Sequence, residues 1–367
     1  MTDRKQSGAH VAESGASLQS GSGVHAAGSG VQSILEDVRT RGDEALRKWA
    51  LKLDGAEPQR AEPAGDLPEE AVLTLARRVR SWHELQRPRD VRLEVEPGVE
   101  LERRWVPLDA VGVYVPRGLL STLVMCVVPA QLAGVRRIAV ATPPERAGTI
   151  AAAAQLLGIE EVWALGGPPA IAALAYGTAS IERVDKIVGP GGAHVNQAKL
   201  TVSREVAIDL PAGPSEVVVL AGTGADRRAA ALELAAQREH GPGGVCRLIE
   251  ADEDAEAALA RAEAVAPEHL VLLGDDVEAL AGRVRNAGAV FVGAASSVAA
   301  GDYATGGNHV LPTGGWARAV GGLGLETFLK PVTVQRVTPD GLARLRPLVE
   351  ALAAVEGMPA HAEAVRR

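Results

Sequence analysis

The sequence contains little cysteine, with only Cys126 and Cys246 among its 367 residues. The two lie far apart and no Cys-x-x-Cys motif occurs, so the sequence offers neither a disulfide framework nor a cysteine metal motif. A reducing compartment, the cytoplasm, is therefore the expected location. The N-terminus lacks the apolar core of a signal peptide. The longest apolar run, residues 119–135, contains Pro129 and is too short to span a bilayer comfortably.

Aromatic side chains and blocks of like charge are also scarce. Aromatic residues make up 3% of the chain, and 38 Lys and Arg residues stand against 46 Asp and Glu residues, a formal net charge of -8. The charges form no basic block, which argues against nucleic acid and anionic membranes as partners. The 47% apolar and 23% charged content is typical of a soluble globular protein. A chain of this length is expected to form two domains or one large α/β unit.

No Gly-x-Gly-x-x-Gly motif occurs, yet from residue 110 the chain alternates between short β-branched runs and stretches rich in Ala and Leu. Such alternation predicts parallel sheets with crossover helices. The expected strands are residues 111–115, 137–141, 161–165, 184–188, 216–221, 245–250, 270–273 and 289–292. The fold class is therefore predicted as α/β, with two Rossmann-like modules whose parallel sheets are flanked by helices, plus a helical C-terminal tail.

Composition and periodicity divide the chain into four parts. Residues 1–30 are rich in Gly, Ser and Ala without a helical or strand period, which predicts a flexible arm. Residues 31–110 together with 215–322 are expected to form a first α/β domain, and residues 111–214 a second. The helical period of residues 323–367 predicts the tail.

Polar residues gather at four points near the ends of expected strands and helices, where α/β proteins bind ligands. These clusters pair Gln237 with His240, Glu268 with His269, Asp302 with His309, and Glu356 with His361. Each pair alone is ordinary, because helix caps, turns and solvated loops use the same residues. Together, glutamine, histidine and aspartate donors make a set suited to Zn²⁺. The adjacent Glu268–His269 pair would then supply acid–base chemistry.

Signals for phosphate binding are weaker. The segment "VGPGGAHVNQAK", residues 188–199, follows an expected strand and opens a helix, so its backbone N–H groups could hold a phosphate. The loop "YVPRG", residues 114–118, could line a cofactor cleft. His83 lies on a polar helix and is expected to be solvated surface. From these patterns alone, a zinc hydrolase and a zinc-assisted dehydrogenase both remain open.

Several longer motifs occur in a fixed order along the chain. They are "VGVYVPRG", "PAQLAGVRRIAVATPP", "GTASIERVDKIVGPGGAHV", "AIDLPAGPSEVVVLA", "QREHG", "APEHL", "GDYATGGNHVLPTGG" and "MPAH". In this order they resemble the histidinol dehydrogenases, and the resemblance runs from about residue 31 to the C-terminus. It implies the last enzyme of histidine biosynthesis, a zinc-dependent homodimer that oxidises L-histidinol through histidinal to L-histidine with two NAD⁺.

The resemblance also implies roles for individual residues. The zinc shell would be Gln237, His240, Asp302 and His361, with the tail histidine supplied by the partner subunit. Glu268 and His269 match the acid–base pair, and Tyr114 matches a contact to NAD. Substrate contacts would come from Ser215, Gln237, His240, His269, Asp302, His309, Glu356 and His361. On this basis the tail is expected to be exchanged between subunits, the first domain to carry the chemistry and the second to hold NAD.

Three departures from the family pattern fall on the cofactor side. Pro169 stands where the family has a glutamine that contacts NAD, and Gly192 stands where it has an asparagine. The loop after Tyr114 is a few residues shorter than the family's. Losing two ordinary hydrogen bonds would weaken NAD binding by roughly 1–3 kcal/mol in total, unless Arg117 compensates by pairing with the pyrophosphate.

These departures leave two alternatives to a histidinol dehydrogenase. One is a related zinc-dependent alcohol dehydrogenase acting on another small polar alcohol, although His309 and Glu356 argue against a different substrate. The other is a paralogue that binds zinc and ligand but uses NAD weakly. A cysteine mechanism is disfavoured, because Cys246 lies in a strand-like run where a buried, inert thiol is expected.

Overall fold

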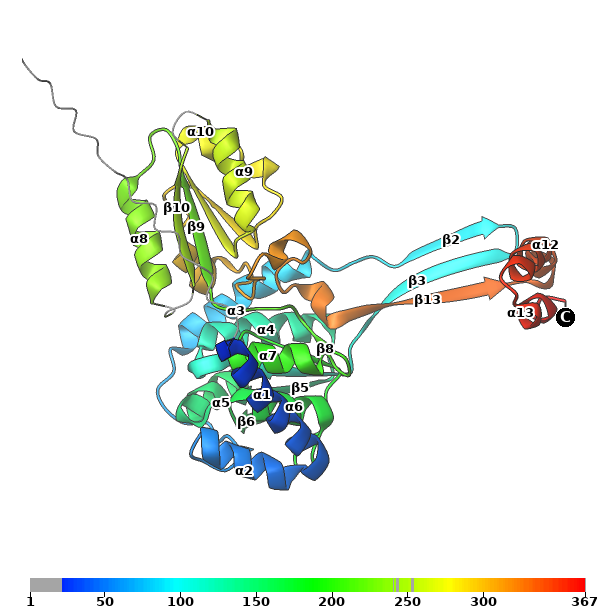
Figure 1. Ribbon diagram of the computed structural model, residues 1–367, viewed down its shortest axis with the longest axis horizontal. Helices are drawn as coiled ribbons and strands as arrows, with labels where there is room; N and C mark the ends of the chain where they lie inside the picture. Colours follow the sequence, from blue (N-terminus) through cyan, green and yellow to red (C-terminus); the bar gives the residue numbers. More distant parts are fainter. Residues whose placement is uncertain (1–21, 240, 242–243, 252–253, 367) are drawn as a thin grey trace, which may run out of the picture.

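The computed structural model describes residues 22–239, 241, 244–251 and 254–366 of the chain. Figure 1 shows two α/β bodies and a long arm that projects away from them and carries the C-terminus. The predicted α/β class is confirmed, since each body is built on a mainly parallel sheet with helices on both faces. Within the described ranges, no helix is both long and apolar enough to cross a membrane.

The first body contains a six-stranded sheet in the order β1-β6-β5-β4-β7-β8. Only β1 runs antiparallel to its neighbour. The strands are β1 (Gln59–Arg60), β4 (Ala110–Tyr114), β5 (Arg137–Thr142), β6 (Val162–Ala164), β7 (Lys186–Val188) and β8 (Ala207–Ile208). One face is covered by α3 (Glu69–Glu84), α4 (Leu120–Ala133) and α5 (Ala147–Leu156). The other is covered by α1 (Ser22–Arg41), α2 (Asp43–Leu53), α6 (Gly167–Tyr176) and α7 (Ala193–Val202).

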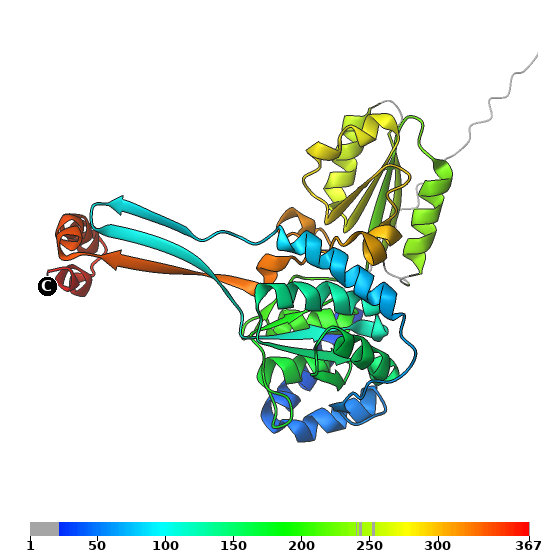
Figure 2. The ribbon, with the colours of Figure 1, turned by 180° about the vertical axis from the view of Figure 1, so that it is seen from behind.

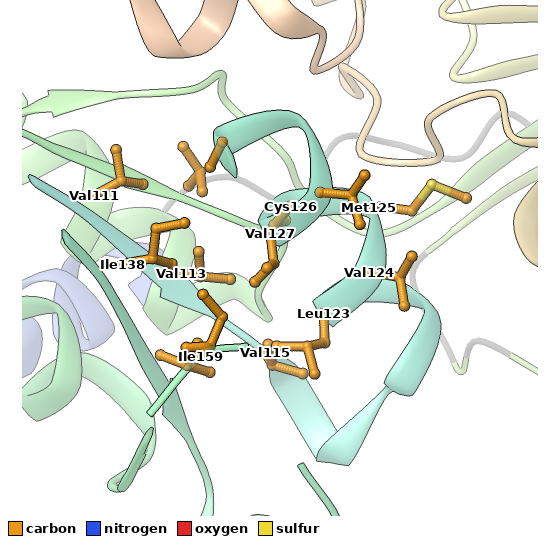
Figure 3. Packing of buried hydrophobic residues seen from close by; sticks show 14 of the residues in the cluster. Val111, Val113, Val115, Leu123, Val124, Met125, Cys126, Val127, Ile138 and Ile159 are labelled. Atoms are coloured by element: carbon orange, nitrogen blue, oxygen red, sulfur yellow. The ribbon is translucent and has the colours of Figure 1, made fainter. Parts of the chain in front are cut away.

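Helix α4 lies at the centre of this body. Its side chains from Leu123 to Val127 are fully buried, which suits a helix that is apolar on every side. Figure 3 shows Val127 facing Val113 of β4, whereas Val124 and Met125 point to the other side of the helix. Pro129 is accommodated inside the helix, which then ends at Gly134 in the left-handed conformation. The apolar run seen in the sequence is thus a core helix.

The second body contains a four-stranded parallel sheet in the order β10-β9-β11-β12. Its strands are β9 (Glu216–Ala221), β10 (Val245–Glu250), β11 (His269–Leu273) and β12 (Ala289–Val292). Helix α8 (Arg227–Arg238) covers one face, and α9 (Ala255–Val265) and α10 (Asp275–Glu278) cover the other. Asp226 and Asp254 cap α8 and α9, because each carboxylate accepts hydrogen bonds from two N–H groups of the first turn.

The arm is a three-stranded antiparallel sheet in the order β13-β3-β2, tipped by two helices (Figure 2). It comprises β2 (Val91–Glu96), β3 (Val99–Pro107), β13 (Leu329–Val337), α12 (Pro339–Val355) and α13 (Pro359–Ala364). Several apolar side chains along it are exposed, among them Leu93 at 62% and Val355 at 88%. Several exposed apolar side chains on one projecting element favour an interaction site there.

The structure departs from the expected boundaries at three points. Residues 22–30 belong to helix α1, whereas the rest of the expected flexible arm lies outside the described residues. Residues 31–53 pack on the six-stranded sheet, away from the 215–322 segment with which they were grouped. The tail contains strand β13 as well as helices, and it joins β2 and β3 in the arm. Local periodicity identifies an element but does not reveal which distant sheet it joins.

A buried ion pair joins two loops at the edge of the six-stranded sheet. Lys199 donates hydrogen bonds to the Gly189 carbonyl and to the Asp209 carboxylate, and both charged side chains are at most 1% exposed. Asp209 also accepts from the Gly189 N–H at 2.7 Å. Gly189 is required there, because a Cβ would lie 2.2 Å from the Tyr114 carbonyl oxygen. The pair thus fixes the start of the Gly189–Gly192 loop.

We expect Lys199→Met to lower the free energy of unfolding by about 3–5 kcal/mol, because it leaves the buried Asp209 carboxylate without its cation. Urea denaturation followed by circular dichroism measures the change. Replacing both partners, with Lys199→Met and Asp209→Asn, removes the uncompensated charge and should recover part of the loss. Equal stability of the single variant and the wild type would show that the pair does not stabilise the fold.

Candidate active site

A cleft of about 220 Å³ lies between the two bodies and is lined by five of the polar residues singled out in the sequence, Ser215, Glu268, His269, Asp302 and His309. The first body contributes loops that follow β4 and β7, at the carboxyl edge of its parallel sheet. The second contributes residues at the amino ends of β9 and β11. The lining residues include Arg117, Thr122, Gly191, Gly192, Ser215, Glu268, His269, Asp302, Tyr303 and His309.

The Glu268 carboxylate is held in a fixed orientation at the start of β11. One of its oxygens accepts a hydrogen bond from the Ser215 hydroxyl at 2.6 Å and another from the Glu216 N–H at 2.8 Å. The side chain is almost fully buried. These donors stabilise the ionised form and aim the carboxylate at the cleft. Glu268 therefore has the environment of an oriented base.

His269 is positioned with one ring nitrogen bonded and the other without a partner. Its Nδ1–H donates to the Glu216 carbonyl oxygen at 2.9 Å, which fixes the tautomer and leaves the lone pair on Nε2. Nε2 is buried, has no hydrogen-bond partner among the described residues, and lies 3.9 Å from Asp302 Oδ1. Burial lowers the pKa of His269 despite the nearby carboxylates. The ring is therefore neutral near pH 7 and can accept a proton at Nε2.

Asp302 lies on a single π-helical turn, η4 (Gly301–Thr305), a distortion often found at functional sites. Burial raises the pKa of Asp302 to about 6; nearby His269 opposes the rise, and the carboxylates of Glu268 and Glu233 add to it. Several carboxylates thus share a buried region whose described lining includes one exposed arginine, Arg117, and no lysine. Such a concentration of negative charge is favourable for a bound cation.

Gln237 is the next residue expected to bind metal, and it faces the interior from α8. Its side chain is 5% exposed and its Nε2 has no partner among the described residues. One turn earlier on the helix, the Glu233 carboxylate accepts from the Val298 N–H next to η4. A 180° turn of the amide would place its oxygen at this buried position, where a bound cation would offset the cost of leaving the group unpaired. Gln237 therefore has the environment of a ligand residue.

The expected zinc ligands do not all meet within one chain. His240 lies outside the described residues. His361 in α13, together with Glu356 at the end of α12, is exposed at the tip of the arm, away from the cleft (Figure 1). Accordingly, the part of the chain that the structure describes contains no group of three His, Cys, Asp or Glu residues suited to a metal. Of the described members of the expected set, Gln237 and Asp302 lie on the elements around the cleft and His361 does not.

His309 lies in the cleft as expected. Its Nδ1–H donates to the Asp302 carbonyl oxygen at 3.0 Å, and its Nε2 accepts from the Thr122 hydroxyl at 3.2 Å. His309 therefore connects the turn that carries Asp302 with helix α4 of the other body.

His83 supports the same loop, and the expectation that it is solvated is wrong. It is fully buried, and its Nδ1–H donates to the Val79 carbonyl oxygen at 2.7 Å. Its Nε2 accepts from the Asn308 amide at 3.3 Å. The signal was present in the sequence, because Val72, Leu75 and Val79 share the helical face of His83.

The cofactor side differs from the expectation for Tyr114. Its side chain is 4% exposed, and its hydroxyl accepts a hydrogen bond from the Gly167 N–H at 3.1 Å. Burial raises the pKa of this hydroxyl. Tyr114 thus supports the start of α6 from within the core, whereas Gly192 lines the cleft. Residues without a distinctive local motif, such as Thr122 and Tyr303, were missed by the sequence analysis.

Neither thiol is expected to take part in chemistry at this site. Cys126 is fully buried in α4, burial raises the pKa of its thiol, and the described lining of the cleft includes no cysteine. In a Cys246→Ala variant, Cys126 is the one remaining thiol. We expect it to react with dithionitrobenzoate at least about a hundredfold more slowly in the native protein than in urea. Rapid reaction of the native variant would contradict the buried position.

Comparison with known proteins identifies the family. The family model for histidinol dehydrogenase matches residues 19–258 and 247–367. The histidinol dehydrogenase of Methanosarcina mazei is 37% identical over all of this chain and 97% of its own length, and that of Caulobacter vibrioides is 41% identical over 90% of each. A crystal structure of histidinol dehydrogenase from Elizabethkingia anophelis has a TM-score of 0.86 at 33% identity, covering 95% of this chain and 93% of that one. The chain belongs to the histidinol dehydrogenase family of oxidoreductases.

Proposed function

We propose that this protein oxidises L-histidinol through histidinal to L-histidine, with two NAD⁺ as electron acceptors and a zinc ion in the cleft. The proposal is supported mainly by two possible bases at the start of β11. They are the Glu268 carboxylate, which is held by hydrogen-bond donors, and the neutral His269 ring. The balanced reaction consumes one alcohol, one water and two NAD⁺. It yields one carboxylate, two NADH and three protons.

His269 is suited to the first oxidation. As hydride leaves the carbinol carbon, the alcohol proton must go to a base, and Nε2 is buried, unprotonated and directed at the cleft. A depressed pKa keeps this nitrogen available near pH 7. The bond from Nδ1 to the Glu216 carbonyl prevents the ring from turning away.

Glu268 is suited to the second oxidation. The intermediate aldehyde must add water before a second hydride can leave, and the carboxylate can take the proton of that water. Ser215 and the Glu216 N–H hold the carboxylate in place without neutralising it. Because the two bases are adjacent in the chain, one bound substrate can meet both without leaving the cleft.

The residues around the cleft fit a zinc ion. The donor set Gln237, His240, Asp302 and His361 supplies oxygen and nitrogen atoms that Zn²⁺ accepts. The unpartnered Gln237 amide and the mutual repulsion of Asp302, Glu268 and Glu233 support a cation there. Zinc would serve as a Lewis acid that orients the amino alcohol. Ser215 and His309 then remain as further contacts for the substrate.

A homodimer would complete this site. His361 and Glu356 lie on the exposed arm, whose apolar residues Leu93, Leu352 and Val355 have no covering element within the described chain. Two chains related by a twofold axis could each extend the arm over the other, so that each cleft receives the other chain's His361. Burial of the apolar arm residues would stabilise that arrangement.

The first test measures NADH formed by the zinc-loaded protein from a known quantity of L-histidinol. We expect two NADH per histidinol. Because the bases serve different steps, His269→Asn should lower kcat with histidinol, and Glu268→Gln should lower kcat with histidinal, each by about 10²–10⁴-fold. The Glu160→Gln variant, which removes an exposed carboxylate, serves as the control.

Two outcomes would contradict this scheme. Wild-type protein that stops at one NADH is not a four-electron dehydrogenase. Protein that binds zinc and histidinol but forms no NADH supports the alternative of a binding paralogue. That alternative is favoured by Gly192 and Pro169, which offer the cofactor no side-chain hydrogen bond.

A second test concerns the shared site. With histidinal as the substrate, we expect His361→Asn and Glu268→Gln, each nearly inactive alone, to regain activity when co-refolded. Random pairing gives half heterodimers, and each has one cleft with both wild-type residues, so activity should reach roughly a quarter of wild type. If every cleft used its own chain's His361, the mixture would stay inactive. Size-exclusion chromatography of each variant controls for loss of the dimer.

A further inference from the structure

Two helices begin where the first body meets the cleft, and neither has a capped N-terminus. Helices α4 and α7 have no side-chain cap and no acidic residue in the first turn. The positive ends of their dipoles are thus not neutralised by their own first turns. Helix termini alone do not define a binding site, but the positive ends of these dipoles favour a negatively charged ligand at this edge of the first body.

An apolar cavity of about 440 Å³ adjoins the cleft at Gly192, which lines both. Its walls are formed by α1, α6 and the start of α7, with Ile34, Pro168 and Val195 among the lining side chains. Such walls suit a flat aromatic base. Gly192, called the ridge below, therefore lies between two chambers. The polar chamber is the cleft that holds Glu268 and His269, and the apolar chamber is the cavity beside α1 and α6.

Arg117 lies at the rim of the polar chamber in a backbone conformation that arginine rarely adopts. Its φ is 52° and its ψ is 18°, in the left-handed region. The turn is held by Pro116 before it and by Gly118 after it, where an added Cβ would lie 2.2 Å from the Arg146 Cβ. A strained non-glycine residue at a cleft is a pointer to function.

The Arg117 guanidinium also lacks a partner within the protein. It makes no hydrogen bond or ion pair with the described residues, and no other arginine or lysine occurs among the described residues that line either chamber. The two uncapped helices and the exposed Arg117 side chain both favour an anion near Gly192. A guanidinium binds phosphate oxygens in pairs, which a helix terminus alone cannot do.

We propose that Arg117 binds the pyrophosphate of the dinucleotide, which crosses the ridge at Gly192 with its nicotinamide toward His269 and its adenine in the apolar chamber. This proposal rests on the proposed function, since it concerns the electron acceptor of the same site. Arg117 thereby supplies the polar contact that Gly192 and Pro169 cannot provide.

The test measures ligand dissociation constants by titration calorimetry and NMR, without turnover. Arg117→Ala should raise the dissociation constants of NAD⁺ and ADP-ribose by about tenfold to a hundredfold. The dissociation constant of adenosine, which has no phosphate, should change by no more than about twofold. Arg204→Ala removes the same charge at the far end of α7 and is the matched control. Arg117→Gly should weaken NAD⁺ equally and raise the melting temperature by about 1–3 °C, because glycine relieves the left-handed strain.

The outcomes separate this proposal from the proposed function. Wild-type protein without affinity for NAD⁺ would overturn the use of a dinucleotide and, with it, the role of Arg117. Wild-type binding that Arg117→Ala leaves unchanged would overturn the role of Arg117 alone. Two other results would likewise show that no phosphate is bound at Arg117. One is an equal loss of NAD⁺ affinity in Arg117→Ala and Arg204→Ala. The other is a loss of adenosine affinity in Arg117→Ala as large as the loss of NAD⁺ affinity.

Discussion

The parallel pairing of β9 with β11 is the constraint on which the site depends. In this register His269 lies opposite Val217, so Ser215 and Glu216 lie beside Glu268 and His269. The hydroxyl and N–H of the first pair orient the carboxylate, and the Glu216 carbonyl fixes the tautomer of the ring. A shift by one residue would turn every side chain to the opposite face. The buried strands thus hold two reactive groups within one hydrogen-bonding frame.

Glu268 and His269 lie in a buried region that contains several carboxylates, which favours a cation near them. Glu216, Glu233 and Asp302 all surround His269, yet burial still lowers the pKa of its ring. The same burial raises the pKa of Asp302. These charges disfavour one another within the described chain, and the proposed zinc ion would relieve their repulsion. His361 of the proposed zinc shell lies apart from them, on the exposed tip of the arm.

The sequence predicted the local elements well and their distant partners poorly. The β-branched runs became strands within a residue or two, and the pairs Glu268–His269 and Asp302–His309 line the cleft. The register of β13 against β3 was not predictable, because the strands are more than 200 residues apart. The burial of His83 was predictable from its apolar helical face, whereas its partner, Asn308, was not, because only the tertiary fold brings that loop near. Tyr114 matched a motif, but its burial depends on packing that no motif records.

The two bodies contribute different kinds of residue to the cleft. The second body supplies the proton acceptors, whereas the first supplies Arg117, Gly191 and Gly192, none of which can accept a proton near pH 7. Changes in the first body therefore act on the affinity for the electron acceptor and leave the proton-transfer geometry of β11 intact. Thr122 and His309 are the exception, because their hydrogen bond joins the two bodies. Through that bond, a shift of α4 on cofactor binding would reach the Asp302 turn, which the bonds from Arg78 to the Ala304 carbonyl and between His83 and Asn308 also tie to the first body.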